Sequence, residues 1–300
     1  MLYVHNLSYR YGPALPWVLR DIHLTLPEQG ILGLIGHNGA GKSTLLSIIA
    51  GLYEIEPGDI QDNQRNTLSG KKLIDLVAIV PQDFAFYQDL SVLQNLQLFY
   101  RVAAASQKVN SLNNIIETCQ LATLLKKPVR HLSGGQKRKL NLAIGLIKDT
   151  KILLLDEPTV GIDPESKQEL LNVVKSLAIA GKLIVYTSHI LSEVEQICDY
   201  FCILHQGAIK LTPTAFGQLE NSEQIILQLK SIDDRHKLDS LVATMNKHWV
   251  NPNTLTLHNL DISYAQLLLR IEQAGVALRS SSFGSGALEQ LYFSLTREER

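Results

Sequence analysis

This 300-residue chain has few cysteines, no long apolar run and almost no net charge. Its three cysteines, Cys119, Cys198 and Cys202, are too few and too scattered for a disulfide framework, which favours a reducing cytosol. Cys198 and Cys202 lack the second pair that a zinc site requires, so core packing is expected. No apolar run approaches the roughly 18 to 20 residues of a membrane span, and no signal segment is evident. Work at a membrane therefore needs a partner chain.

The charge balance removes a general attraction to polyanions. The 28 basic and 29 acidic residues give a formal net charge of −1, which provides no global pull toward nucleic acid or an anionic membrane. The run Lys137-Arg138-Lys139 is basic, but no wider basic stripe surrounds it, so a solvated helix face is the better interpretation. We expect no nucleic-acid partner.

A glycine-rich segment matches the G-x-x-x-x-G-K-[ST] pattern of a phosphate-binding loop. It follows a predicted buried strand at 31–35 and precedes a predicted helix at 45–50, the context that the pattern requires. The glycines let backbone N–H groups converge on an anion, and the helix start adds positive potential. Lys42 is expected on the β- and γ-phosphates and Ser43 on Mg²⁺. The residues of the loop are Gly36, His37, Asn38, Gly39, Ala40, Gly41, Lys42, Ser43 and Thr44.

Polar residues follow three further predicted strands, at 76–80, 152–155 and 183–187. In an open α/β sheet such residues point toward the ligand crevice. Asp156 is expected to hold a Mg²⁺ water shell, and Glu157 to polarise the attacking water. Gln82 reaches Mg²⁺ or the water, or is an ordinary loop glutamine. His189 contacts the γ-phosphate, or is structural.

A second helix start suited to anions begins at Ser133, a good N-cap, and continues through Gly134, Gly135 and Gln136. Near the N-terminus, an aromatic ring of Tyr9 or Tyr11 either stacks on a nucleobase or packs on a small sheet.

The pattern as a whole predicts an α/β fold with two domains. Residues 1–215 form a phosphate-loop core with a mainly parallel sheet, an N-terminal antiparallel β subdomain and an inserted helical subdomain at about 88–150. A polar, turn-rich linker at 212–222 leads to a small α+β domain of plaited β-α-β type at 222–300. Its predicted elements are strands 224–230, 253–258 and 276–283 and helices 234–247, 263–274 and 286–295.

Residues 2 to 215 closely resemble the ATPase subunit of ATP-binding cassette transporters. The segment Leu132 to Gln136 is similar to that family's signature sequence. The resemblance implies that Tyr11 stacks on adenine, that Gln82 senses Mg²⁺ and signals to the membrane chains, and that Asp156 and Glu157 are the metal-holding and catalytic acids. It further implies that Asp163 communicates across a dimer and that His189 is the switch histidine.

In that family, ATP lies between the phosphate loop of one subunit and the signature helix of another, in a homodimer or a heterodimer. The implied partners are ATP, Mg²⁺ and an integral membrane permease, which places the chain at the inner face of the cell membrane. The C-terminal domain, which ends in 287–293, is similar to an extra domain of some export ATPases. His37 stands where Pro or Ser is common in that family's phosphate loop, and Ile162 stands where Leu is usual in its aspartate turn. Neither change removes a group that the chemistry requires.

We therefore expect an ATP-hydrolysing subunit that powers a separate permease, with export favoured by the C-terminal domain alone. A cassette ATPase of translation or DNA repair is the alternative, but such chains usually carry two cassettes or a long coiled-coil insertion. A binding module without hydrolysis is a third hypothesis, which Glu157 and His189 oppose. The sequence does not reveal the cargo.

Overall fold

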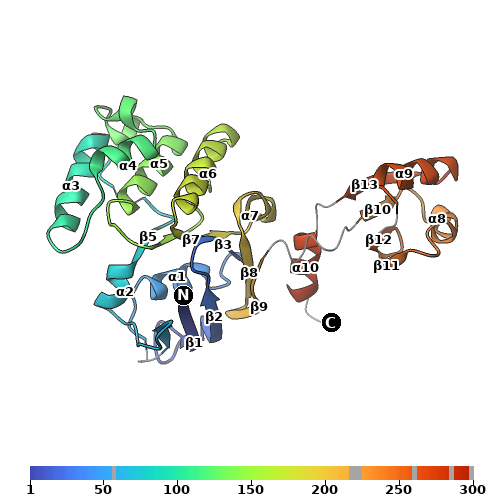
Figure 1. Cartoon of the computed structure of the whole chain (residues 1–300), viewed down its shortest axis with the longest axis horizontal. Coiled ribbons are helices and arrows are strands. Elements are labelled where there is room, and N and C mark those ends of the chain that lie inside the picture. The colour runs from blue at the N-terminus through green and yellow to red at the C-terminus, as the bar shows by residue number, and fades with distance from the viewer. Residues whose placement is uncertain (56–58, 85, 216–224, 259–261, 284–286, 297–300) are drawn as a thin grey trace. The chain divides into compact units, whose positions relative to one another are not determined.

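The computed structural model describes residues 1–55, 59–84, 86–215, 225–258, 262–283 and 287–296 (Figure 1). The chain divides into two compact units, Met1–Thr214 and Ala215–Arg300. Of the predicted linker, 212–215 belong to a strand, and 216–222 lie outside the described residues. Among the described residues, each helix is too short or too polar to cross a bilayer.

A six-stranded sheet forms the centre of the first unit. Its strands lie in the order β5 (Val77–Val80), β6 (Ile152–Leu155), β7 (Leu183–Ser188), β3 (Gly30–Ile35), β8 (Tyr200–His205) and β9 (Ala208–Ala215). The first five pair in parallel. Strands β6 and β7 are apolar and almost wholly buried, as strands covered on both faces are. The predicted mainly parallel sheet is confirmed, and the segments that follow β3, β5, β6 and β7 lie at one edge of it.

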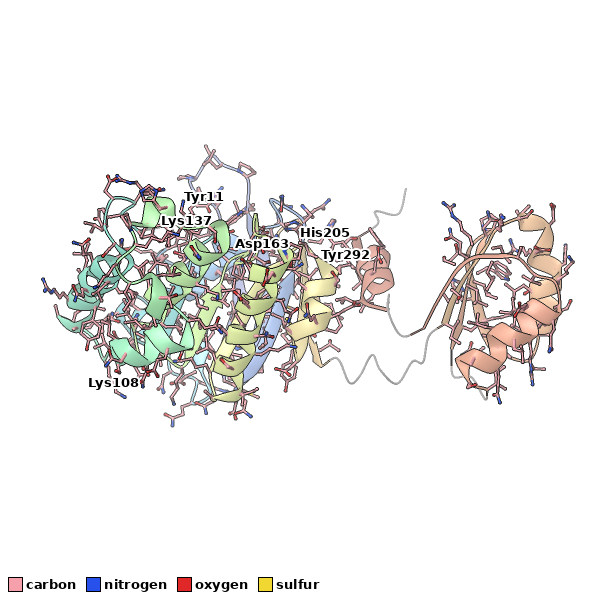
Figure 2. The ribbon with its side chains drawn as sticks, turned by 90° about the horizontal axis from the view of Figure 1, so that it is seen from above. Tyr11, Lys108, Lys137, Asp163, His205 and Tyr292 are labelled. Carbon is pink, nitrogen blue, oxygen red and sulfur yellow. The ribbon has the colours of Figure 1, made fainter. Side chains whose placement is uncertain are left out.

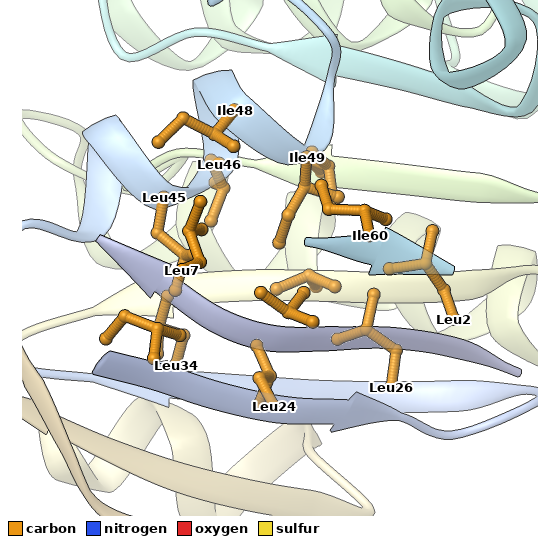
Figure 3. Packing of buried hydrophobic residues seen from close by; sticks show 14 of the residues in the cluster. Leu2, Leu7, Leu24, Leu26, Leu34, Leu45, Leu46, Ile48, Ile49 and Ile60 are labelled. Carbon is orange, nitrogen blue, oxygen red and sulfur yellow. The ribbon is translucent and has the colours of Figure 1, made fainter. Parts of the chain in front are cut away.

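The N-terminal part forms a second, antiparallel sheet of β2 (Leu19–Leu26), β1 (Leu2–Tyr9) and β4 (Ile60–Asp62). Alternate residues of β1 and β2 are buried against helix α1 (Lys42–Ile49), whose apolar side chains appear above the strands in Figure 3. Burying each such leucine or isoleucine contributes about 1.5–3 kcal/mol. This packing fixes the helix that begins at Lys42, and with it the position of the phosphate-binding loop.

Helices occupy the segment between β5 and β6, as predicted for the inserted subdomain. They are α3 (Val92–Ala104), α4 (Leu112–Thr118) and α5 (Gly134–Gly145), with short 3₁₀ turns at Ala122–Leu124 and Val129–His131. Ser91 and Gln94 cap α3 through a reciprocal pair of side chain to backbone hydrogen bonds. Three further helices flank strands of the core: α2 (Lys71–Leu76), α6 (Pro164–Ile179) and α7 (Leu191–Ile197).

The second unit is a four-stranded antiparallel sheet with two main helices. Its elements are β10 (Ile225–Leu229), a 3₁₀ turn (Ile232–Asp234), α8 (Arg235–Leu241), β11 (Asn246–Asn251), β12 (Thr254–His258), α9 (Tyr264–Gln273), β13 (Leu278–Phe283) and α10 (Ala287–Thr296). The sheet order β11-β12-β10-β13 with the chain order β-α-β-β-α-β is a split β-α-β plait. The predicted plaited α+β type is confirmed.

The predicted helix at 234–247 is wrong over its second half. The helix ends at Leu241, and Asn246–Asn251 forms a strand that pairs with β12 across a two-residue turn. The strand is fixed by Trp249, whose indole N–H donates to Asp239 Oδ1, and by Lys247, whose ammonium lies 2.7 Å from the same oxygen. Pairing with β12 therefore outweighs helix propensity in this short segment.

Candidate active site

The phosphate-binding loop joins the carboxyl end of β3 to helix α1. Gly39 and Gly41 have φ of 82° and 105°, in the left-handed region that favours glycine. A Cβ on Gly36 would stand 2.5 Å from the carbonyl oxygen of Leu204, so this position requires close backbone approach. The result is a tight turn whose amides converge at a helix start, the arrangement of an anion-binding nest.

Lys42 lies at the centre of the loop and is 5% exposed. Its ammonium donates to the carbonyl oxygens of Gly36 at 2.8 Å and His37 at 3.2 Å. The same ammonium forms an ion pair with Glu157 Oε1 at 3.0 Å. These contacts hold one buried cation over the mouth of the loop, where an anion would be attracted to it.

Glu157, which follows β6, contacts both the phosphate-binding loop and the end of β7. The residue is 7% exposed and its φ is 44°, a strained conformation for a side chain of this kind. Oε2 lies 3.2 Å from Nδ1 of His189, which follows β7. The carboxylate therefore sits between a lysine and a histidine contributed by different strand ends.

Thr187, at the end of β7, contacts both acids and was not among the residues expected at the site. Its hydroxyl donates to Asp156 Oδ1 at 2.8 Å and accepts from the Glu157 amide at 2.8 Å. Thr187 is fully buried and Asp156 is 6% exposed. In the sequence, the one indication of this role is that Thr187 directly precedes Ser188 and His189 at the end of a predicted strand.

A pocket of about 270 Å³ opens between the phosphate-binding loop and Glu157, and Asp156, Thr187 and His189 are not among its lining residues. Gln82, which follows β5, lines it together with Glu157, and Ser43 lines it from the loop. Ser43, Gln82 and Asp156 offer oxygen ligands, the type that Mg²⁺ prefers, so this set fits that ion. The lining residues are Val18, Asn38, Gly39, Gly41, Lys42, Ser43, Thr44, Gln82 and Glu157.

A larger cavity, of about 620 Å³, lies at the amino ends of β3 and β8. Its lining combines Lys175, Gln196 and Asp199 with apolar residues of α6 and α7. It contains neither a glycine-rich turn nor a helix start. We therefore assign the phosphate site to the smaller pocket, because its lining has the required chemistry although its volume is less.

Tyr11 reaches the phosphate-binding loop directly. Its hydroxyl lies 2.8 Å from Oγ1 of Thr44, and its ring stands edge-on to both Tyr9 and Tyr53. The residue is 54% exposed, so a large part of its surface remains open to a ligand. Tyr9 is less exposed, and its ring stacks on Tyr53. Of the two tyrosines, the structure leaves Tyr11 the more accessible.

The second helix start does not line this pocket. Ser133 caps α5 through a reciprocal pair of hydrogen bonds with Gln136, and Ser133 and Gly134 are exposed. Asp163 caps α6, because its carboxylate accepts a hydrogen bond from the backbone N–H of Ser166. This bond, together with one from the Ser166 side chain, lowers the pKa of the Asp163 carboxyl. In Figure 2, Asp163 and Lys137 of α5 lie toward the same edge of the first unit as Tyr11, with Lys108 at the opposite edge.

The basic run on α5 is not a solvated face, contrary to expectation. Arg138 and Lys139 are each 7% exposed. Arg138 donates to the carbonyl oxygens of Gln82 at 2.5 Å and Val160 at 3.0 Å, and its guanidinium lies 4.6 Å from the Phe84 ring centre. Arg138 thus ties the start of α5 to the segments that follow β5 and β6.

Comparisons with known proteins agree with this geometry. The family model described as "ABC transporter" matches residues 19–160. The linearmycin resistance ATP-binding protein LnrL of Bacillus subtilis is 32% identical over 99% of this chain and 98% of its own length. The lantibiotic transport ATP-binding protein SrtF of Streptococcus pyogenes is 34% identical over 75% of this chain and 95% of its own.

Solved structures share the fold of the first unit. A structure described as an ATP binding subunit of an ABC transporter has a TM-score of 0.61 at 28% identity, and the match covers 73% of this chain and 92% of that one. The dimeric ATP-binding cassette MJ0796, in a post-hydrolysis state with ADP and Pi, has a TM-score of 0.61 at 22% identity, over 72% of this chain and 98% of that one.

Proposed function

Because this chain belongs to the ABC transporter family, as an ATP-binding subunit, we propose that it hydrolyses ATP to drive a separate membrane permease in the direction of export. The observation that carries this proposal is the cluster of Lys42, Glu157 and His189 at the phosphate-binding loop. The names of LnrL and SrtF, a resistance and a lantibiotic transport protein, support transport over a role in translation or DNA repair.

In the proposed reaction, Glu157 accepts the proton of the attacking water and His189 holds the carboxylate and contacts the γ-phosphate. Lys42 exchanges its contact with Glu157 for the phosphate oxygens, and the amides of 36–44 bind the remaining charge. Tyr11 stacks on the adenine. The strained backbone of Glu157 suits this role, because a fixed base requires little reorganisation when the water reacts.

Mg²⁺ is proposed as the ion that neutralises charge on the β- and γ-phosphates. Ser43 and Gln82 would hold it directly from the wall of the pocket, and Asp156 through its water shell. Thr187 keeps one Asp156 oxygen engaged, which orients the carboxylate.

We further propose that two chains pair head to tail, as a homodimer or with a second ATPase subunit. Ser133, Gly134, Gly135 and Gln136 would then cover the γ-phosphate bound by the other chain, and Asp163 would contact its site. Support comes from the exposure of Ser133 and Asp163, which cap helices away from their own pocket. The structure of MJ0796 is described as dimeric, which supports pairing of two chains.

The permease is proposed to dock beside Gln82, at the cytoplasmic face of the membrane. Large apolar side chains are exposed there, Phe84 and Tyr87 after β5 and Leu98 and Val102 on α3. Arg138 packs on the Phe84 ring and bonds the Gln82 carbonyl, so docking at this surface would act on the active site. We propose 1–215 as the cassette domain, with about 88–150 as its helical subdomain, and 222–300 as the small C-terminal domain.

The decisive experiment is the Glu157→Gln variant of the full chain. We expect steady-state phosphate release from Mg-ATP to fall about 10²-fold or more, since a general base contributes that much. ATP binding should persist or tighten, because one negative charge leaves the phosphate pocket. The matched control is Glu117→Gln, an exposed glutamate on α4 outside this pocket, which should retain its turnover. Wild-type turnover in Glu157→Gln would remove this residue from its proposed role.

A further inference from the structure

A buried carboxylate outside the phosphate pocket contacts four polar groups from three segments. Glu193 of α7 is 2% exposed. Its Oε2 accepts from the hydroxyls of Thr159 at 2.8 Å, Tyr186 at 3.0 Å and Ser188 at 3.3 Å. Its Oε1 lies 3.2 Å from the Lys167 ammonium of α6.

Two of these partners stand next to the residues proposed to do the chemistry. Thr159 follows Glu157 by two positions in the chain. Ser188 immediately precedes His189, and the Ser188 hydroxyl also accepts from the Ile190 amide at 2.9 Å. His189 therefore sits inside a turn that Ser188 closes, and the same hydroxyl is held by Glu193.

The third partner, Tyr186, belongs to β7 and is fully buried. Burial and the nearby Glu193 carboxylate hold the pKa of its phenol well above the ordinary value, so the hydroxyl stays a donor. The Tyr186 hydroxyl also lies 3.1 Å from the Thr159 hydroxyl. A carboxylate at position 193 accepts hydrogen bonds from three hydroxyls and one ammonium. A glutamine amide would not fit these partners, because its NH₂ group is a donor.

We propose that Glu193 is a positioning residue of ATP hydrolysis, which fixes the segment after Glu157 and the end of β7 in one arrangement so that Glu157 and His189 keep their contact. This inference rests on the proposed function of those two residues. Side chains on β7 alternate between the two networks, because Tyr186 and Ser188 contact Glu193 whereas Thr187 contacts Asp156 and the Glu157 amide. A displaced Glu193 would therefore move both acids and the histidine.

The test compares kcat of phosphate release with the dissociation constant for a fluorescent ATP analogue, on the purified full chain. For Glu193→Gln we expect kcat to fall about tenfold to 10²-fold, the range for a small misplacement of reacting groups. The dissociation constant should change less than about twofold, since Glu193 is not among the residues of the phosphate pocket. Glu195→Gln, an exposed glutamate on the same helix, should keep wild-type values.

A milder pair of variants keeps the proposal testable if Glu193→Gln does not fold. Thr159→Val removes the hydroxyl that faces Glu193 with little change of shape, whereas Thr159→Ser retains it. We expect kcat to fall several-fold in the valine variant and to stay within about twofold of wild type in the serine variant. Equal kcat in both would overturn the proposal.

A double variant separates positioning from general structural support. Groups that act through one residue are not additive, so in a Glu157→Gln background the further change Glu193→Gln should alter the residual rate less than about twofold. The same tenfold drop in both backgrounds would overturn the inference. If Glu157→Gln itself retains wild-type turnover, the proposed function fails; if it loses turnover while Glu193→Gln and Thr159→Val retain it, only this inference fails.

Discussion

Gly135, in the first turn of α5, packs against the first turn of α6 without space for a side chain. A Cβ on Gly135 would stand 2.2 Å from Ser166 Cβ and 2.3 Å from its hydroxyl oxygen. Contacts that short do not occur, so Gly135→Ala must push the two helix starts apart. Such overpacking costs about 1–3 kcal/mol in unfolding free energy, less the benefit of up to about 1 kcal/mol that alanine has over glycine in a helix.

The neighbouring glycine provides the matched control. A Cβ on Gly134 would meet only the Gly161 carbonyl oxygen at 3.3 Å and an Ile162 methyl at 3.5 Å. Small adjustments relieve such contacts, so we expect Gly134→Ala to change the unfolding free energy by less than about 1 kcal/mol. The two variants make the same chemical change at adjacent residues, and they differ in the space available for the added Cβ.

A second substitution should rescue the first. Once Ser166 is glycine, the nearest of its atoms to the added Cβ is Cα at 3.5 Å, an ordinary contact. Ser166→Gly alone should cost about 0.5 kcal/mol through helix propensity. Gly135→Ala with Ser166→Gly should cost no more than that, because alanine is favoured over glycine in a helix. The two changes should therefore couple favourably by about 1–3 kcal/mol.

Urea unfolding measures these differences. The chain has two tryptophans, Trp17 and Trp249, one in each unit. In a Trp249→Phe background, Trp17 fluorescence reports on the first unit, and the linear dependence on urea gives the free energy. A Gly135→Ala chain as stable as Gly134→Ala, or additive losses in the double variant, would refute the packing argument.

Two further predictions use pKa shifts. Hydrogen bonds from Ser166 lower the pKa of Asp163 in the folded chain, so its stabilising effect exists above the ordinary value near 4 and is lost as the pH falls through the lower folded value. Asp163→Asn should therefore be less stable than wild type at pH 7 by urea unfolding, and the difference should shrink as the pH falls below about 4; a difference that does not change with pH would contradict this. Burial raises the pKa of all three thiols, to about 12 for two of them, so iodoacetamide at pH 8 should label them far more slowly in the native than in the urea-unfolded chain, and equal rates would contradict their burial. The thiols are those of Cys119, Cys198 and Cys202.

Sequence reasoning located the strand ends well, because the apolar strands and the polar residues after them are local patterns. Parallel strands share one direction, so Gln82, Asp156 and His189 were expected at the same edge, and β5, β6 and β7 are neighbours in the sheet. What the pattern could not show was the partner of each side chain. Thr187 contacts Asp156, and Glu193 contacts Thr159, across more than 30 positions of the chain.

The failures have the same physical origin. Arg138 and Lys139 look like a charged helix surface, yet their partners come from other elements: Arg138 bonds carbonyls after β5 and β6, and Lys139 pairs with Glu169. The strand β4 was missed because three residues carry too little periodicity, and its register is set by pairing with β1. Local composition cannot reveal burial that distant segments impose.

The contacts of Arg138 and Glu193 lead to one view of how the site is held. Arg138 connects α5 to the backbone after β5 and after β6, and Glu193 connects α7 to the Thr159 side chain after β6 and to the end of β7. The segment between Glu157 and Asp163 is thus held at Thr159 and at Val160 by two different side chains. In the proposed dimer, a movement of the helix start at Ser133 would reach Val160 through Arg138. Glu193 would then determine how much of it reaches Glu157.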